Sequence, residues 1–323
     1  MATVALKNPE LRIIPLEEAD LPALERLFDE QCEEWLRLLK WDYSGPSRLI
    51  REVARHRELS GYVALMGDLT VGFSFYVIEG NRCSIGDIYV SREWRGQGAD
   101  RLMAGAILDR LDRLPRLRRV ESQCVSVGNF SASELFEARS FNRYERFYML
   151  SEARAFDDAS VRAGGEDDPD ILVRPWRDDD FGDAARIIQR SYRGEPDSLI
   201  NSQYRTESGC AELLSILTDH IWCGDFLPDV TRVAVDRARG ASVGVLIASR
   251  IGSRSGHISQ ISLLPSYQNR GIGRRMIRAA LGEFKGRGFS TASLAVTSAN
   301  LSALRLYQSC GFRTVHSFPV FYR

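Results

Sequence analysis

The sequence predicts an α/β protein that consists of two related domains. Its 323 residues are enough for two domains of ordinary size, each with a core of its own. A short glycine-containing segment follows an apolar run twice, at 95–100 and at 268–273. Other landmarks recur around these segments in the same order, which indicates a duplicated domain. The repeated landmarks are Pro15 and Pro175, Gly72 and Gly244, Arg95 and Gln268, and Asn129 and Asn300.

The two halves share one order of elements. A strand at 12–14 or 172–174 precedes an acidic turn and a helix that Asp20 or Asp180 can cap. Three apolar runs bounded by turn residues then predict three strands in each half. These strands lie at 62–66, 71–78 and 84–90 in the first half, and at 231–235, 243–250 and 257–264 in the second. The second half also carries a longer insertion, at 191–230.

An acidic segment separates the halves. Residues 151–170 contain seven acidic side chains and two basic ones, with Gly164 and Gly165 near the middle. Such a composition does not build a core, so it predicts a linker. The predicted organisation is therefore a first domain at 1–150, a linker at 151–170 and a second domain at 171–323.

The composition limits the class of protein. Hydrophobic residues make up 44% and charged residues 27%, which is typical of a globular chain. With 43 basic and 43 acidic residues, the chain has no net charge to favour nucleic acid or a membrane surface. No segment is long and apolar enough to span a bilayer, and residues 1–8 lack the apolar centre of a secretory signal. The six cysteines are scattered without a C-x-x-C pair. We therefore expect reduced thiols, no metal site and a cytoplasmic location.

The second glycine segment predicts a phosphate site. Residues 268–273, Gln-Asn-Arg-Gly-Ile-Gly, follow the apolar run 261–264 and open a segment with helical spacing of its apolar residues. A strand, a tight loop and a helix N-terminus together point backbone N–H groups at one place, at the positive end of the helix dipole. The glycines leave room for an anion, where a Cβ would block its approach or the turn.

Further residues lie downstream of this loop at characteristic spacing: Asn300, Ala303, Leu306, Tyr307, Gly311 and Phe312. The combination Q-x-x-G-x-G, a strand, and then N-x-x-A-x-x-L-Y-x-x-x-G-F resembles the GNAT superfamily of acyl-CoA-dependent acetyltransferases. The resemblance implies two GNAT-like domains, each a mixed, mostly antiparallel sheet flanked by helices. The duplication resembles tandem GNAT proteins such as mycothiol synthase, as a comparison of architecture only.

The resemblance also implies a function and a set of site residues. The expected activity is acetyl-CoA-dependent N-acetylation of a small-molecule or peptide amine, catalysed by the second half. The alternative is a non-catalytic acyl-CoA-binding or scaffolding protein, and a homodimer is left open. Residues matching the family's cofactor-binding positions are Ile261, Ser262, Leu263, Gln268, Asn269, Arg270, Gly271, Ile272, Gly273, Arg274, Asn300 and Ala303.

Tyr307 matches the tyrosine that GNAT enzymes commonly use as general acid, although a core aromatic is the plain alternative. Asn300 either contacts the pantetheine arm or caps the helix that follows. Many relatives carry a carboxylate on the strand at 257–262 as the base, whereas this strand offers only His257 and Gln260 as polar side chains of size. His257 is the named candidate for the base. Glu195 or Asp225 in the insertion, or a chain of water molecules, remain alternatives.

The first half departs from this pattern at three functional positions. Asp100 replaces Gly273, Phe136 replaces Tyr307, and Ser140 replaces Gly311. A carboxylate in the first turn of a helix caps the free N–H groups itself and repels a phosphate. Phe136 has no proton to donate. We therefore expect the first half to be a degenerate domain that does not bind coenzyme A productively; weak binding is the alternative.

Overall fold

The computed structural model describes residues 10–123, 125, 130–156, 168–219 and 221–323. These residues form two units, each taken by itself below. Unit 1 consists of the described residues within Met1–Glu33, Ser47–Arg143 and Phe318–Arg323, and unit 2 of those within Glu34–Pro46 and Tyr144–Ser317. The units thus differ from the predicted halves at three places, because residues 34–46 and 144–150 belong to unit 2 and the last six residues belong to unit 1.

Unit 1 contains a sheet in the order β1-β2-β3-β4-β5, antiparallel except for the parallel pair of β4 and β5. The end of β13 adds to this sheet, since Phe321 pairs with Ser122 of β5. Buried residues of α3 and of the strands form its core. The strands are β1 (Leu11–Pro15), β2 (Gly61–Met66), β3 (Leu69–Glu79), β4 (Arg82–Val90) and β5 (Arg119–Ser122), and the helices are α1 (Leu21–Leu39), α2 (Ser44–Arg55), α3 (Ala99–Asp112) and α4 (Ser133–Glu137), with short 3-10 turns at Leu16–Glu18 and Arg92–Trp94.

Unit 2 contains a sheet in the order β7-β9-β10-β11-β12-β6. Its neighbouring strands are antiparallel except for β11 and β12, and β8 pairs with β10. The strands are β6 (Asn142–Glu152), β7 (Ile171–Pro175), β8 (Asp225–Phe226), β9 (Arg232–Asp236), β10 (Ala241–Gly252), β11 (Ser255–Leu263), β12 (Thr291–Thr297) and β13 (Arg313–Tyr322).

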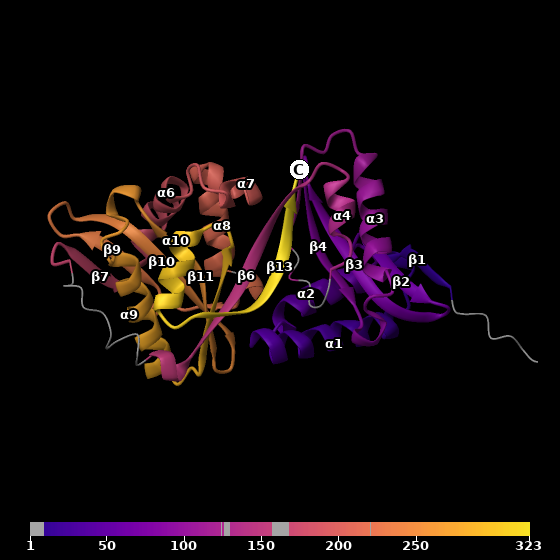
Figure 1. Ribbon diagram of the computed structural model, residues 1–323, viewed down its shortest axis with the longest axis horizontal. Helices are drawn as coiled ribbons and strands as arrows, with labels where there is room; N and C mark the ends of the chain where they lie inside the picture. Colours follow the sequence, from indigo (N-terminus) through magenta and orange to yellow (C-terminus); the bar gives the residue numbers. More distant parts are fainter. Residues whose placement is uncertain (1–9, 124, 126–129, 157–167, 220) are drawn as a thin grey trace, which may run out of the picture. The chain divides into compact units, whose positions relative to one another are not determined.

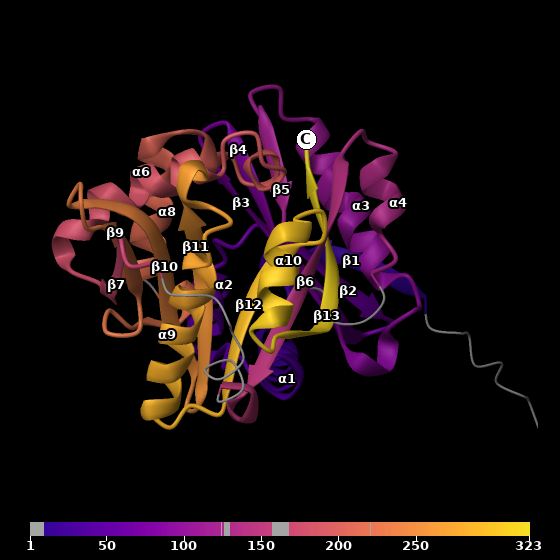
Figure 2. The ribbon, with the colours of Figure 1, turned by 60° about the vertical axis from the view of Figure 1, so that its left-hand side comes forward.

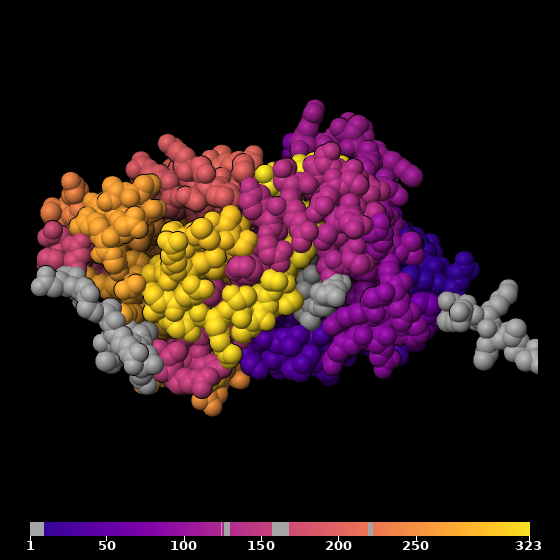
Figure 3. All heavy atoms as spheres, viewed as in Figure 1, coloured from indigo at the N-terminus to yellow at the C-terminus, as the bar shows by residue number. Residues whose placement is uncertain are grey.

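Helices cover both faces of this sheet (Figure 1 and Figure 2). Alternate residues of a strand point to opposite faces, so Ala234, Leu246 and Ala248 pack with α9 and α10, whereas Val233 and Val245 pack with α6 and α8. In the space-filling view, α9 in gold and α10 in yellow lie beside each other on the visible face of unit 2 (Figure 3). The helices are α6 (Phe181–Ser191), α7 (Asp197–Ile200), α8 (Glu207–Asp219), α9 (Ile272–Gly286) and α10 (Leu301–Ser309), with 3-10 turns η3 (Asp178–Asp180), η4 (Ser202–Arg205), η5 (Ile221–Cys223) and η6 (Pro265–Tyr267).

The α/β class and the mixed, mostly antiparallel sheets are confirmed, and each predicted strand overlaps a strand of the structure. The predicted linker is partly structured, since β6 extends to Glu152 and Phe156 is buried in the core of unit 2. Its residues 157–167, including Gly164 and Gly165, lie outside the described residues. Within the described ranges, no helix is long and apolar enough to cross a membrane.

Candidate functional site in unit 2

The glycine loop connects β11 to the N-terminus of α9, as the sequence predicts. Gly271 precedes the first residue of α9 and has φ 76°, in the left-handed region that glycine favours, and Asn269 has φ 59°. A Cβ on Gly273 would lie 3.2 Å from Leu306 and 3.4 Å from Leu263, so this position is closely packed. The N–H groups of the first turn of α9 have no partner within the helix, so they can donate hydrogen bonds to an anion.

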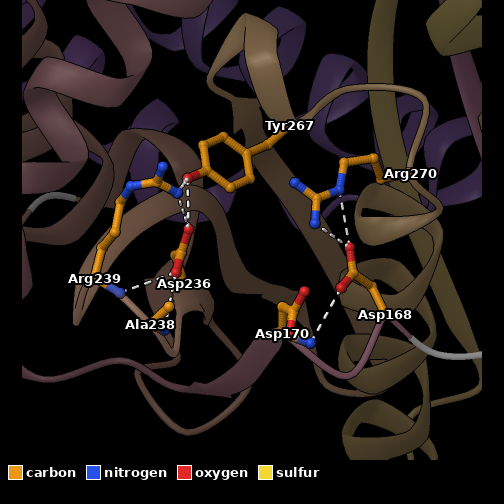
Figure 4. A network of polar contacts seen from close by, with 7 residues as sticks. All are labelled: Asp168, Asp170, Asp236, Ala238, Arg239, Tyr267 and Arg270. Atoms are coloured by element: carbon orange, nitrogen blue, oxygen red, sulfur yellow. Dashed lines mark hydrogen bonds and ion pairs between the residues drawn. The ribbon is translucent and has the colours of Figure 1, made fainter.

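Two acidic side chains hold the residues next to this loop (Figure 4). Asp168 accepts hydrogen bonds from Arg270, at 2.9 Å from Nε, and pairs with its Nη2 at 2.6 Å. The phenol of Tyr267 donates to Asp236 Oδ2 at 2.7 Å, and Arg239 donates to the same oxygen at 2.8 Å. These two donors hold the pKa of Asp236 well below its usual range. The loop is therefore held by an ion pair at Arg270 and by a hydrogen bond at the preceding Tyr267.

A cavity of about 590 Å³ extends from this loop between β11 and α10. It brings together all the predicted cofactor-binding residues except Arg270, which pairs with Asp168 instead. The cavity is lined by Ser191, Tyr192, Glu195, Ile261, Ser262, Leu263, Gln268, Asn269, Gly271, Ile272, Gly273, Arg274, Asn300, Ser302, Ala303, Arg305, Leu306 and Tyr307.

Tyr307 lies on α10 and is 6% exposed, with its side chain at the wall of the cavity. No described residue forms a hydrogen bond with its phenol. Burial raises the pKa of Tyr307 well above its usual value, and the nearby Tyr192 and Asp197 add to this rise. The phenol is therefore protonated at neutral pH, which is the state that a proton donor requires.

Asn300 takes the capping role that the sequence left open. Its Oδ1 accepts a hydrogen bond from the backbone N–H of Ala303 at 3.1 Å, which caps α10. Asn300 also lines the cavity, and no described residue accepts from its Nδ2. Capping and cofactor contact are therefore compatible in one side chain.

The cavity wall opposite α10 comes from the insertion between α6 and β9. Glu195 is exposed, lines the cavity and has a carboxylate without a hydrogen bond or ion pair to any described residue. Tyr192 lies beside it and accepts a hydrogen bond from Gln260 of β11 at 2.9 Å. An uncompensated carboxylate at this wall suits a positively charged amine.

The other candidates for the base lie elsewhere in unit 2. His257 is 6% exposed, contacts Ser293 Oγ through Nδ1 at 2.8 Å, and packs against the ring of Trp41 at 4.9 Å. Burial lowers its pKa to about 4. Asp225 pairs with Arg250 at 2.6 Å. Neither residue lines the cavity, so the geometry favours Glu195.

Sequence reasoning missed a buried ion pair behind this wall. Arg146 of β6 donates to Asp197 Oδ1 at 2.9 Å, and Thr297 of β12 donates to the same oxygen at 2.7 Å. Asp197 is 6% exposed and begins α7, so this contact fixes the insertion against the sheet. Arg146 comes from the first half of the sequence, and no local pattern links it to a residue of the insertion.

Among the described residues of unit 1, Asp100 accepts hydrogen bonds from Ser131 and not, as expected, from the free N–H groups of its own helix α3. Asp100 accepts hydrogen bonds from the backbone N–H of Ser131 at 2.6 Å and from its hydroxyl at 2.8 Å. Phe136 is fully buried and stacks on Phe321 with a centroid distance of 4.3 Å. Asn129, the counterpart of Asn300, lies outside the described residues. No group of three or more His, Cys, Asp or Glu side chains in the described parts of either unit is arranged to hold a metal ion.

Comparisons with known proteins agree with this geometry. A model of the acetyltransferase (GNAT) family matches residues 17–141 and again 199–312. The N-alpha-acetyltransferase RimI of Mycobacterium tuberculosis is 37% identical over 90 residues, which are 27% of this chain and 55% of that protein. The [ribosomal protein bS18]-alanine N-acetyltransferase of Escherichia coli K12 is 38% identical over 52 residues, 16% of this chain and 35% of that protein. The chain thus spans about half or less of the length of these relatives.

Two solved structures share the fold over the whole length of the chain. A GCN5-related N-acetyltransferase from Sphaerobacter thermophilus has a TM-score of 0.63 at 18% identity, covering 98% of this chain and 96% of that chain. A tandem GNAT protein from the clavulanic acid biosynthesis pathway has a TM-score of 0.57 at 12% identity, covering 97% and 98%.

Proposed function

The chain belongs to the acetyltransferase (GNAT) family and is an acyltransferase, and we propose that unit 2 transfers the acetyl group of acetyl-CoA to a small-molecule or peptide amine. One observation carries this proposal: a single cavity joins the glycine loop at the N-terminus of α9 to the phenol of Tyr307. The first suits the pyrophosphate of coenzyme A, and the second suits its leaving sulfur. The names of the two partial relatives favour the α-amine of a peptide as acceptor.

The cofactor contacts follow from the lining of the cavity. The backbone N–H groups of 271–273 would hold the pyrophosphate, helped by the dipole of α9. The backbone of Ile261, Ser262 and Leu263 would pair with the amides of the pantetheine arm. Asn300 and Ala303 would contact the same arm from the side of α10.

The proposed chemistry needs two proton transfers. The acceptor nitrogen attacks the thioester carbonyl carbon as a neutral amine. Glu195 takes one proton from this nitrogen, directly or through water, as the carbon–nitrogen bond forms. The carbon–sulfur bond then breaks, and the departing thiolate takes the phenolic proton of Tyr307. Tyr307 belongs to the buried core of unit 2, as the non-catalytic alternative expects, but it also lines the cavity, and this second position supports the enzyme.

Unit 1 is proposed to be a structural partner that does not bind coenzyme A productively. Asp100 lies in the first turn of α3, and its carboxylate is held there by hydrogen bonds from Ser131. Its negative charge also opposes a phosphate in the first turn of α3.

Calorimetry with acetyl-CoA tests the assignment. We expect a stoichiometry of one per chain and no binding by Gly273→Asp, because the new carboxylate meets Leu306 and repels the phosphate. Gly282→Asp is the matched control, since Gly282 is exposed on the same helix with open space around it. Unchanged affinity in Gly273→Asp, or a stoichiometry of two, contradicts the proposal. Release of free coenzyme A against a panel of amines and peptides then identifies the acceptor class.

A further inference from the structure

Two tyrosines of the insertion stack against each other beside the cavity. Tyr192, at the end of α6, and Tyr204, in η4, have ring centroids 4.0 Å apart and an interplanar angle of 6°. Both hydroxyl groups contact the side chain of Gln260 on β11. The stacked rings and the contacts with Gln260 therefore hold both hydroxyl groups in fixed positions.

The two phenols differ in their hydrogen bonds with Gln260. Tyr204 donates its proton to Gln260 Oε1 at 3.0 Å, whereas Tyr192 accepts from Gln260 Nε2 at 2.9 Å. The same Nε2 also donates to Ser262 Oγ at 2.9 Å, so both N–H bonds of the amide are used. The proton of Tyr204 is therefore committed to Gln260, whereas outside this tyrosine pair no residue in the described part of the chain accepts the proton of Tyr192.

The two phenols also differ in their surroundings. Tyr192 lines the cavity together with Ser262 and Tyr307, whereas Tyr204 does not. The pKa of Tyr307 responds to the charge of Tyr192, which reflects their proximity. The reactive thioester must lie between β11 and Tyr307 if Tyr307 is to protonate its sulfur. Tyr192 therefore lines the cavity together with the residues between which the thioester would react.

We propose that Tyr192 donates its phenolic hydrogen bond to the thioester carbonyl oxygen of bound acetyl-CoA and stabilises the negative charge that forms there. When the acceptor nitrogen attacks, the carbonyl π-electron pair moves to this oxygen. When the tetrahedral intermediate collapses, the pair returns, the carbon–sulfur bond breaks and the thiolate takes its proton from Tyr307. Tyr192 keeps its proton throughout. The inference rests on the proposed function of unit 2.

Two features suit Tyr192 to this role. Burial raises its pKa to about 12, so the phenol stays protonated at neutral pH. Stacking on Tyr204 and the bond from Gln260 hold its oxygen before the substrate arrives, and a donor fixed in advance is what gives such groups their effect.

Isotope-edited infrared spectroscopy of acetyl-CoA labelled with ¹³C at the carbonyl tests the contact without knowledge of the acceptor. A hydrogen bond lowers the carbonyl stretching frequency of the bound thioester. We expect Tyr192→Phe to lose a large part of this lowering, while Tyr204→Phe, the matched control, keeps it. Gln260→Glu is a second variant: its carboxylate only accepts, so it captures the Tyr192 proton and also reduces the lowering. An unchanged frequency in Tyr192→Phe overturns the inference.

Turnover gives a second readout. Enzyme-catalysed hydrolysis of acetyl-CoA should fall by about 10²–10³ in Tyr192→Phe, as for other lost oxyanion donors, with unchanged affinity for acetyl-CoA. A fall in affinity with unchanged turnover would overturn the inference and leave the proposed function intact. Absence of acetyl-CoA binding to the wild-type chain would overturn both.

Discussion

The buried imidazole of His257 should make the stability of the chain sensitive to acid. Its ring contacts Ser293, Trp41 and Tyr148, and burial lowers its pKa from an ordinary 6.5 to about 4. The folded state therefore holds His257 neutral, whereas the unfolded chain takes up a proton below pH 6.5. Because His257 has the lower pKa in the folded state, the stability that its neutral ring contributes is fully present above pH 6.5. This contribution is lost as the pH falls towards 4.

The size of the effect follows from the two pKa values. The interval from 6.5 to about 4 corresponds to about 3 kcal/mol of unfolding free energy, which is a large part of the stability of an ordinary domain. Replacing His257 with Gln keeps a polar partner for Ser293 and removes the titration. The stability of His257→Gln should therefore decline less between pH 6.5 and 4 than that of the wild type.

Urea unfolding at a series of pH values measures this difference, and the NMR titration of the His257 ring reports its pKa directly. Parallel stability curves for the two proteins, or a ring pKa at or above 6.5, would refute the reasoning. The same variant addresses catalysis. If the acidic limb of the kcat/KM profile disappears in His257→Gln, then His257 and not Glu195 is the base.

Three further outcomes are expected. Tyr307→Phe should lower turnover by about 10²–10⁴-fold. Acetyl-CoA affinity and melting temperature should change little, because no described residue loses a hydrogen bond. Unchanged turnover would make Tyr307 a packing residue. Asp168→Asn removes the ion pair with Arg270 and should tighten acetyl-CoA binding in calorimetry. The gain should be at most about fivefold, since a partly exposed ion pair contributes at most about 1 kcal/mol. Equal tightening in Asp170→Asn, which does not contact Arg270, would show a general charge effect. Arg146→Met should cost about 3–5 kcal/mol of unfolding free energy by leaving Asp197 buried without its cation, and a loss below 1 kcal/mol, or no recovery in Arg146→Met/Asp197→Leu, would contradict this.

The sequence predicts the cofactor end of the site because its determinants are local. The glycine loop, the cap at Asn300 and the position of Tyr307 on α10 each depend on residues a few positions apart. A positive φ, a helix start and a helical repeat all leave marks in a short window of sequence. The apolar runs that form the strands are local in the same way.

The acceptor side could not be predicted from such windows. Arg146 meets Asp197 across 51 positions, Gln260 meets Tyr204 across 56, and Asp168 meets Arg270 across 102. Each contact depends on which strand lies beside which helix, and neither charge nor spacing encodes it. The pairing of β6, from the first half of the sequence, with β12, from the second, could not be predicted either. The repeat pattern suggests that each half forms its own sheet.

In unit 1, the residues at the positions of Gly273 and Tyr307 have partners of their own. Asp100 stands where unit 2 has Gly273 and accepts hydrogen bonds from two donors of Ser131. Its carboxylate is therefore held in the first turn of α3, where its charge opposes a phosphate. Phe136 stands where unit 2 has Tyr307 and packs between Phe141 and Phe321, where a hydroxyl group would need a partner. Phe321 belongs to β13, the last strand described, so its stacking on Phe136 holds the end of this strand in unit 1. Restoring glycine and tyrosine at 100 and 136 would therefore remove stabilising contacts before it created a binding site.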